Sequence, residues 1–306
     1  MYVTKSFNII AVSIIIFITA CVNKEANDDS FRKNMNALIQ KKVQIDEIDP
    51  PELSDEILKS IPSPIQLTSA LKAANIPFNS SVINNSANLS NYNSSFSKAL
   101  NLGIYGADLG YINFYEKNND AISCLNNIKL LAEDLKVSQF FDFETINRLA
   151  QNSKNIDSLI YISTSSFADM DEYLKENGRR NISVLIMYGG WIESMHLLLS
   201  SKKDPNQLPE TVKERIGEQK IVLENLIVIF DAYKKQPKFL NLIKNLNELN
   251  DIYKKVDIKY MTGKTHKKVI DGVLQYVETK TSKVFMSSET LIEIKKKVDL
   301  IRKTLV

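Results

Sequence analysis

Cysteine, histidine and glycine are scarce in this chain, which has 306 residues but only two cysteines, two histidines and nine glycines. An excess of one charge is missing too, because 39 basic side chains face 36 acidic ones and the formal net charge is +3. A balanced chain without a basic stripe of interleaved aromatic residues has no electrostatic footprint for nucleic acid. We therefore expect no nucleic-acid partner.

The common signatures of catalysis are missing as well. Residues 263–265 read Gly-Lys-Thr, but the upstream glycine and the preceding apolar strand of a phosphate-binding loop are not there. No GxSxG, HExxH or CxxC pattern occurs in the chain. The acidic run 169–172 lacks the spacing of a calcium-binding EF-hand loop. The sequence thus supports no catalytic residue, no resident cofactor and no motif-defined metal site.

Proline does not occur between residues 78 and 203, and apolar residues there recur at three- and four-residue spacing. This pattern is typical of long amphipathic helices. We predict helices over residues 64–74, 93–117, 119–135, 143–152, 156–177, 181–201, 210–235, 239–255 and 289–304. Short connections between them favour antiparallel packing.

One segment near the C-terminus has a different composition. Residues 259–286 are rich in β-branched and aromatic residues, and Asp271-Gly272 is a candidate hairpin turn. We predict a small β-hairpin there, with a helix over residues 267–279 as the alternative. The expected fold class is therefore mainly α, an antiparallel helical bundle with a small β-hairpin near the C-terminus.

The N-terminal segment predicts where the protein resides. Lys5 precedes an apolar run over residues 9–18, which is too short to cross a bilayer of about 30 Å as a helix. The run ends in Ile-Thr-Ala-Cys at residues 18–21, which resembles the lipobox of bacterial lipoproteins. That resemblance implies that residues 1–20 are a signal peptide and that Cys21 is acylated. Several acyl chains on this residue would anchor the protein stably to a membrane. An ordinary secretory leader and an uncleaved anchor are the alternatives.

The residues after this leader refine the location. Val22, and not aspartate, follows Cys21, which by analogy with lipoprotein sorting favours the outer membrane. Residues 21–61 are polar and contain Pro50-Pro51, so we predict a lipidated, flexible tether there and a single helical domain over 62–306. The expected location is the cell envelope, lipid-anchored on the periplasmic side or the cell surface.

The other cysteine, Cys124, is expected to be structural. If Cys21 is acylated, Cys124 has no partner in the chain and no disulfide framework exists. Its neighbours Ala121, Ile122 and Leu125 are apolar, which is typical of a small buried residue. No histidine lies near it in the sequence, so a nucleophilic role is not predicted.

Three of the nine glycines lie in the segment LNLGIYGADLGYINFY, which begins at residue 100. Glycine destabilises an isolated helix by roughly 1 kcal/mol relative to alanine, so tertiary packing must compensate. Gly103, Gly106 and Gly110 share one helix face, and we expect another helix to approach the backbone there. The best partner is residues 184–199, VLIMYGGWIESMHLLL, which contains two further glycines.

Asp108 is the one acid of that first segment, and tyrosines lie on both sides of it. A buried carboxylate needs a partner. The partners considered are Arg179, Arg180, Lys129 and a tyrosine hydroxyl. A structural hydrogen bond inside the bundle is the simplest interpretation. If Asp108 and Glu193 face one cleft with Tyr188 and Trp191, a pocket for a small ligand follows.

Glu193 and His196 are three residues apart on one helix face, so together they offer a carboxylate and an imidazole to one metal ion. Ferritin-like di-iron bundles use two such pairs plus two further carboxylates, whereas this chain has one pair. Its other histidine, His266, lies in a Lys- and Thr-rich region. The simpler interpretation is a polar stripe, Gly189, Glu193, His196 and Ser200, that forms hydrogen bonds across a helix seam.

The segment NLGIYGADLGY and the run Gly-Gly-Trp-Ile-Glu at 189–193 resemble a group of uncharacterised cell-envelope lipoproteins of Gram-negative bacteria. The resemblance covers roughly residue 64 to the C-terminus and implies only the location and the helical build. Two function classes follow. The first is a non-catalytic envelope lipoprotein, a scaffold or binding module for a partner protein or a small ligand. The second is a metal- or ligand-binding bundle or enzyme that uses Asp108, Glu193, His196 and Trp191.

Overall fold

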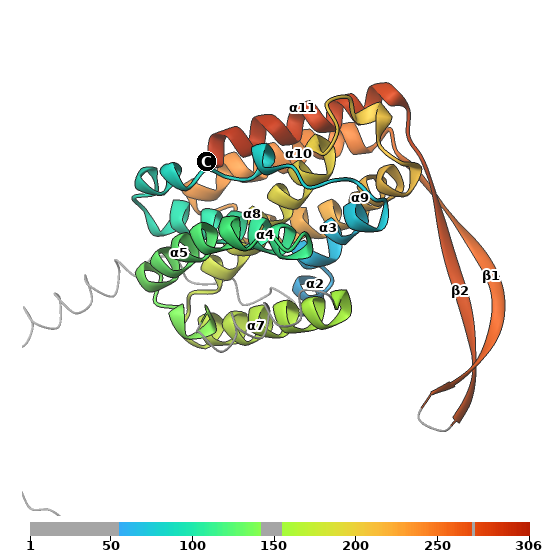
Figure 1. Ribbon diagram of the computed structural model, residues 1–306, viewed down its shortest axis with the longest axis horizontal. Helices are drawn as coiled ribbons and strands as arrows, with labels where there is room; N and C mark the ends of the chain where they lie inside the picture. Colours follow the sequence, from blue (N-terminus) through green and yellow to red (C-terminus); the bar gives the residue numbers. More distant parts are fainter. Residues whose placement is uncertain (1–54, 142–154, 271–272) are drawn as a thin grey trace, which may run out of the picture. The chain divides into compact units, whose positions relative to one another are not determined.

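The computed structural model describes residues 55–141, 155–270 and 273–306, and helices dominate these ranges (Figure 1). They form a mainly α-helical bundle with a two-stranded antiparallel sheet near the C-terminus, as the sequence predicts. The α-helices described are α2 (Asp55–Lys59), α3 (Pro64–Ala73), α4 (Ser95–Phe114), α5 (Asn118–Asp134), α7 (Ile156–Glu176), α8 (Arg180–Ser200), α9 (Glu210–Asp231), α10 (Leu240–Tyr253) and α11 (Ser288–Leu305). The short 3-10 helices are η1 (Ser80–Val82), η2 (Ser86–Asn91), η3 (Ser138–Phe141), η4 (Pro205–Gln207) and η5 (Pro237–Phe239).

The predicted helices agree with these bounds to within a few residues, and the capping residues explain why. The helix α7 ends at Glu176, and Gly178 then takes the left-handed conformation with φ 65°, which glycine adopts without a steric cost. The helix α11 starts after Ser287, whose side chain accepts the N–H of Thr290. The predicted helix over residues 143–152 lies outside the described residues.

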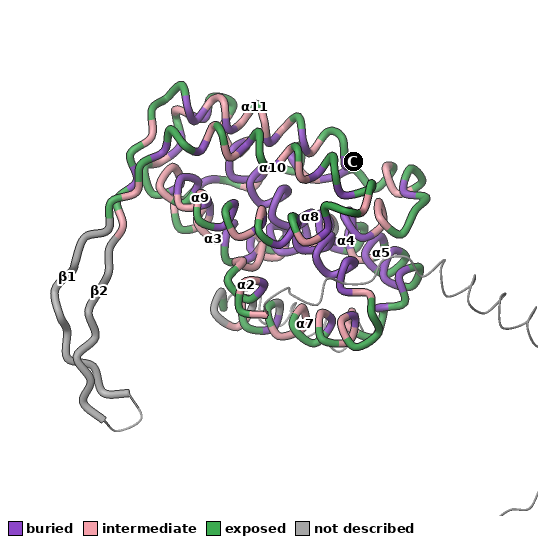
Figure 2. Tube along the Cα trace, turned by 180° about the vertical axis from the view of Figure 1, so that it is seen from behind, coloured by how far each residue is buried: buried purple, intermediate pink, exposed green. Residues whose placement is uncertain are grey.

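The helix α8 is the central element of the bundle, and nearly every residue of it is buried (Figure 2). It packs against α3, α4, α7, α9 and α11. Within the described ranges it is also the one helix long and apolar enough to cross a membrane. Its position inside the bundle accounts for that composition, because a helix surrounded by other helices is apolar on every side.

The glycine-rich segments do pair with each other, as predicted. A Cβ atom added to Gly103 on α4 would overlap the carbonyl oxygen of Ile186 on α8, and one added to Gly189 would overlap the carbonyl oxygen of Leu100. The two backbones are therefore in direct contact. Gly106 differs, because an added Cβ there meets no atom within 4 Å and the residue lines a cavity of about 390 Å³.

Residues 75–92 contain the two 3-10 helices η1 and η2 and are hydrogen-bonded to α4. The N–H of Asn79 donates to the hydroxyl of Tyr111 at 2.9 Å. The hydroxyl of Tyr105 donates to the carbonyl of Asn85 at 2.9 Å. These bonds hold the Asn- and Ser-rich segment over the part of α4 that carries Asp108.

The predicted β-hairpin is present, and its strands are longer than those expected of a small hairpin. Strand β1 (Asp257–Ile270) pairs with β2 (Val273–Phe285) in antiparallel register, with an irregularity between Thr262 and Thr265. Strands, and not the alternative helix, therefore occupy the described part of residues 267–279. Val284 contacts α9 at Gly217, where a larger side chain would overlap it. The expected turn at Asp271-Gly272 lies outside the described residues.

The helical body includes α2, which falls inside the segment 21–61 that the sequence assigns to the tether. Leu58 of α2 is buried in the core. Asp55 pairs with Lys175 at 2.8 Å and with Arg180. Residues 1–54, with the leader and the rest of the predicted tether, lie outside the described residues.

Candidate functional site

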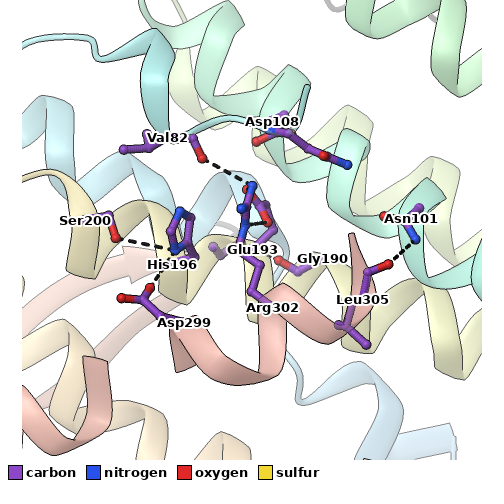
Figure 3. Close-up of polar contacts among 12 residues, drawn as sticks. Val82, Asn101, Asp108, Gly190, Glu193, His196, Ser200, Asp299, Arg302 and Leu305 are labelled. Carbon is purple, nitrogen blue, oxygen red and sulfur yellow. Dashed lines mark hydrogen bonds and ion pairs between the residues drawn. The ribbon is translucent and has the colours of Figure 1, made fainter. Parts of the chain in front are cut away.

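A buried ion pair joins α8 to the last helix, α11 (Figure 3). Nε of Arg302 donates to Oε2 of Glu193 at 2.6 Å, and its Nη2 donates to Oε1 at 2.8 Å. Glu193 has no exposed surface, and Nη2 of Arg302 also donates to the carbonyl of Val82 at 3.3 Å. Bidentate guanidinium–carboxylate pairs are among the strongest polar contacts in proteins. Arg302 thus connects α8, α11 and the η1 segment.

Asp108 on α4 is the second acid at this point. The residue is only 1% exposed. Its Oδ2 accepts the backbone N–H of Asn84 at 2.9 Å, whereas no N–H or O–H donor within the described residues bonds to its Oδ1, which lies near the Glu193 carboxyl group. Burial first, and then the nearby Glu193 carboxylate, raise the pKa of Asp108 well above its ordinary value. The burial and the neighbouring carboxylate therefore favour the protonated form of Asp108 beside the ion pair.

The sequence predicted a buried Asp108 and raised the case in which it faces a cleft with Glu193, and the structure brings these two acids together. The three positively charged partners that the sequence suggested for Asp108 were wrong. Each of them, Arg179, Arg180 and Lys129, has other contacts. Arg179 donates to the carbonyl of Leu135 at 2.8 Å, Arg180 pairs with Asp55 and Asp171, and Lys129 lies near Glu133.

Arg302 is the residue that the sequence reading missed. It stands four residues after Val298 and one after Ile301, both of which lie in the buried stripe of α11. A residue four positions along a helix shares the face of the first one. This spacing is the signal that could have identified Arg302 as an inward-facing base. The sequence does not show which helix Arg302 meets.

His196 belongs to a different polar group from Glu193. Nδ1 of His196 lies 2.8 Å from Asp299 and 3.4 Å from the hydroxyl of Ser200. Lys295 donates to Asp299 and to Ser200, at 2.8 and 2.7 Å. Glu193 and His196 therefore have separate partners on α11, which matches the predicted polar stripe across a helix seam. In the described part of the chain no three His, Cys, Asp or Glu side chains are grouped to hold a metal ion.

Trp191 and Tyr188 face α9 and not the acid pair. Nε1 of Trp191 donates to the side-chain carbonyl of Gln219 at 3.1 Å. The ring of Tyr188 packs against Phe230 with 5.0 Å between the centroids, and burial raises the pKa of its hydroxyl. The four-residue cleft that the sequence suggested is thus divided, because Asp108 and Glu193 lie on one side of α8 and the two aromatic residues on another.

A polar cavity of about 410 Å³ lies beside Asp108, between the Asn- and Ser-rich segment and the first turns of α5. Its described lining includes hydroxyl, amide and carboxyl side chains. Those residues are Ser80, Ser81, Asn84, Asn85, Ser86, Asp108, Asp120 and Ser123, with Ile83, Ile112 and Cys124. The structure therefore provides a binding-sized pocket that Asp108 borders and Glu193 does not line.

Cys124 is buried, as predicted, and forms no disulfide within the described residues. Its thiol donates to the carbonyl of Tyr105 at 3.1 Å. Burial, followed by the charges of Asp108 and Glu193, raises the pKa of the thiol well above its ordinary value. A thiol held in its protonated form is a poor nucleophile, so the contact is a structural one between α5 and α4.

Comparisons with protein-family models, with curated proteins and with solved structures yielded no match to this chain.

Proposed function

We propose that this chain is a lipid-anchored cell-envelope protein whose helical body binds another molecule and does not catalyse a reaction. One observation carries the proposal, the apolar run that ends in Ile-Thr-Ala-Cys at residues 18–21. Several acyl chains on Cys21 would hold the body beside a lipid surface. The resemblance of the glycine-rich segments to envelope lipoproteins supports the same location, with Val22 favouring the outer membrane.

The buried polar groups of the body support a binding role over a catalytic one. General acid–base catalysis needs a titratable group within hydrogen-bond reach of the substrate. Glu193 is fully buried and both of its carboxylate oxygens are bound by Arg302. His196 is paired with Asp299. Neither side chain can reach a substrate unless α11 moves away from α8.

The second candidate is a metal- or ligand-binding bundle or enzyme that uses Asp108, Glu193 and His196. It is favoured by the raised pKa of Asp108, because such perturbed groups are enriched at functional sites. Metal analysis of protein purified without chelator separates the two candidates. A stoichiometric ion that is lost in His196→Ala would replace the first proposal with the second.

Metabolic labelling with an alkyne fatty acid tests the anchor directly. We expect label on the wild type and on Cys124→Ala, the matched control, and no label on Cys21→Ser. The serine variant should also retain its leader, because by the resemblance the leader is cut only before an acylated cysteine. Labelling of Cys21→Ser, or its normal processing and membrane attachment, would overturn the proposal. Crosslinking in intact envelopes, followed by mass spectrometry, then identifies the protein partner.

A further inference from the structure

The β-hairpin carries the net charge of this chain. Residues 257–285 hold six lysines and three acids, whereas the other residues hold 33 basic and 33 acidic side chains. The whole formal charge of +3 is therefore concentrated in the hairpin. A local excess of positive charge attracts partners of the opposite sign. We therefore expect an anionic partner at this part of the molecule.

The hairpin extends beyond the helical body. At its base Val284 packs against Gly217 of α9, and Oγ of Ser282 donates to Oε1 of Glu218 at 2.9 Å. Beyond this base both strands run away from the helices (Figure 1). The strand β1 has 14 residues, which corresponds to about 45 Å at roughly 3.3 Å per residue. Because an isolated two-stranded hairpin is only marginally stable in water, a surface that covers its far end would stabilise it.

The far end of the hairpin is apolar on both strands. In the register of the strands Val269 lies opposite Leu274, and Ile270 lies opposite Val273. Successive residues of a strand alternate between its two faces, so each face of this end has one apolar pair. The described helices do not reach it (Figure 1). An apolar environment for these four residues therefore has to come from outside the helical body.

The residues next to the apolar end have the composition of a membrane interface. Lys267 and Lys268 directly precede Val269 on β1, and Tyr276 on β2 lies opposite Lys267. Lysines are attracted to the surface of an anionic bilayer, and tyrosine is enriched at the boundary between lipid and water.

The same strands limit how deeply the hairpin can enter a bilayer. Glu278 follows Tyr276 by two residues on β2. The described two-stranded sheet also has two outer edges, whose backbone groups find no hydrogen-bond partner in hydrocarbon. The order of residues along the hairpin therefore favours shallow entry of the apolar end, with the lysines at the level of the lipid headgroups.

We propose that this hairpin, residues 257–285, is a membrane-docking arm. Its apolar end enters the interface of a bilayer that contains anionic lipids, and its lysines meet the lipid phosphates. The proposal rests on the location beside a lipid surface proposed above, and it adds a second contact between the protein and that surface. A second copy of the chain fits this end less well, because Lys267 and Lys268 of two hairpins would repel each other.

Quenching of tryptophan fluorescence by brominated lipids tests the contact. The full chain is reconstituted in vesicles of brominated phosphatidylcholine, with or without phosphatidylglycerol, as Leu274→Trp and as Leu240→Trp. Leu240 lies on α10 and is 51% exposed, and Trp191 is buried and gives the same background in both variants. We expect quenching of Leu274→Trp that is strongest with phosphatidylglycerol, and none of Leu240→Trp beyond that background. Absence of quenching in Leu274→Trp, or equal quenching in both variants, would overturn the proposal.

Charge variants of Leu274→Trp test the recognition of anionic lipid. The double change Lys267→Gln and Lys268→Gln should lower the ratio of docked to free hairpin ends about fivefold for each lysine. The control changes Lys296→Gln and Lys303→Gln, both exposed on α11, should leave the quenching unchanged. High salt should weaken it as well. Quenching that depends neither on these hairpin lysines nor on phosphatidylglycerol would overturn the proposal.

Two further outcomes are distinguishable. A blue shift of Leu274→Trp that grows with protein concentration in the absence of vesicles would assign the apolar end to a second copy and overturn the proposal. Because the quenching reports only on the hairpin end, it is independent of the anchor. Fatty-acid label on Cys21 without quenching of Leu274→Trp would overturn the docking arm alone, and quenching without label would overturn the anchor alone.

Discussion

Helices α4 and α8 contact each other in two chemically different ways along one seam. At Gly103 and Gly189 the two backbones touch with no side chain between them. At Asp108 and Glu193 two acids meet, and that region is completed by Arg302 from the C-terminal helix. The contact at the glycines depends only on the small volume of these residues. The contact at the two acids depends on the balance between their negative charges and the positive charge of Arg302. We therefore expect the two regions to respond differently to small substitutions.

The largest effect is expected from Arg302→Met. It removes the basic side chain that binds Glu193 in the described part of the chain and leaves two acids buried, which typically costs about 3–5 kcal/mol of unfolding free energy. Urea unfolding measures the loss, with Lys303→Met on the same turn as the exposed control. Adding Glu193→Met to Arg302→Met should restore much of the stability. A loss below about 1 kcal/mol in the single variant would contradict the buried ion pair.

The glycine contact is tested by a pair of identical substitutions on α4. Gly103→Ala places a methyl group into the carbonyl of Ile186 and should destabilise the fold by about 1–3 kcal/mol through overpacking. Gly106→Ala meets no atom within 4 Å and should stabilise by up to about 1 kcal/mol through helix propensity. Thermal and urea unfolding should show opposite signs. Two losses of equal size would mean that the close approach at Gly103 does not matter.

The acid pair should make stability depend on pH. The pKa of Asp108 in the folded protein is raised above its unfolded value of 3.8. The contribution of Asp108 to the free energy of unfolding is therefore fully present below pH 3.8 and is lost as the pH rises toward the folded pKa. The loss is at most about 1.4 kcal/mol per pH unit. Asp108→Asn should remove this slope, so its stability relative to wild type should increase between pH 5 and pH 8. A difference that does not vary with pH would show that Asp108 is ionised in the folded protein.

The smallest effect is expected from Asp55→Asn on α2. Hydrogen bonds from Lys175 and then Arg180 lower the pKa of Asp55 to about 2, which is the opposite direction to Asp108. This contribution is present above the unfolded value of 3.8 and is lost as the pH falls toward about 2. Because the Asp55 side chain is 42% exposed, screening by solvent limits the stabilisation from its ion pairs to about 1 kcal/mol or less. Urea unfolding at pH 7 and pH 2 checks both the size and the direction.

Local features of the sequence were enough to predict most of the fold. Apolar spacing and the missing prolines predicted the helices, because both act within a few residues of the chain. The helix ends at Gly178 and Ser287 are likewise set by local conformational and hydrogen-bonding properties. The two glycine-rich segments also identified each other, since five of the nine glycines lie in these two apolar segments. Composition likewise favoured strands over a helix near the C-terminus.

The candidate site was predictable only in part. Asp108 and Glu193 stand out because they are acids in apolar helices, and that is visible in the chain. Arg302, the Asn84 N–H and the cavity beside Asp108 come from segments far apart in sequence. Their convergence depends on how the helices are arranged, and no local pattern records that arrangement.

The sequence by itself therefore determined the helices, their ends, the glycine-mediated contact of α4 with α8 and the prediction of a lipid anchor at Cys21. The tertiary structure alone decided which base meets the buried acids, and that Trp191 faces away from them. The reason is physical. Helix formation and backbone approach depend on neighbouring residues, whereas the pKa of a buried acid depends on every charge that folding brings within a few ångströms of it.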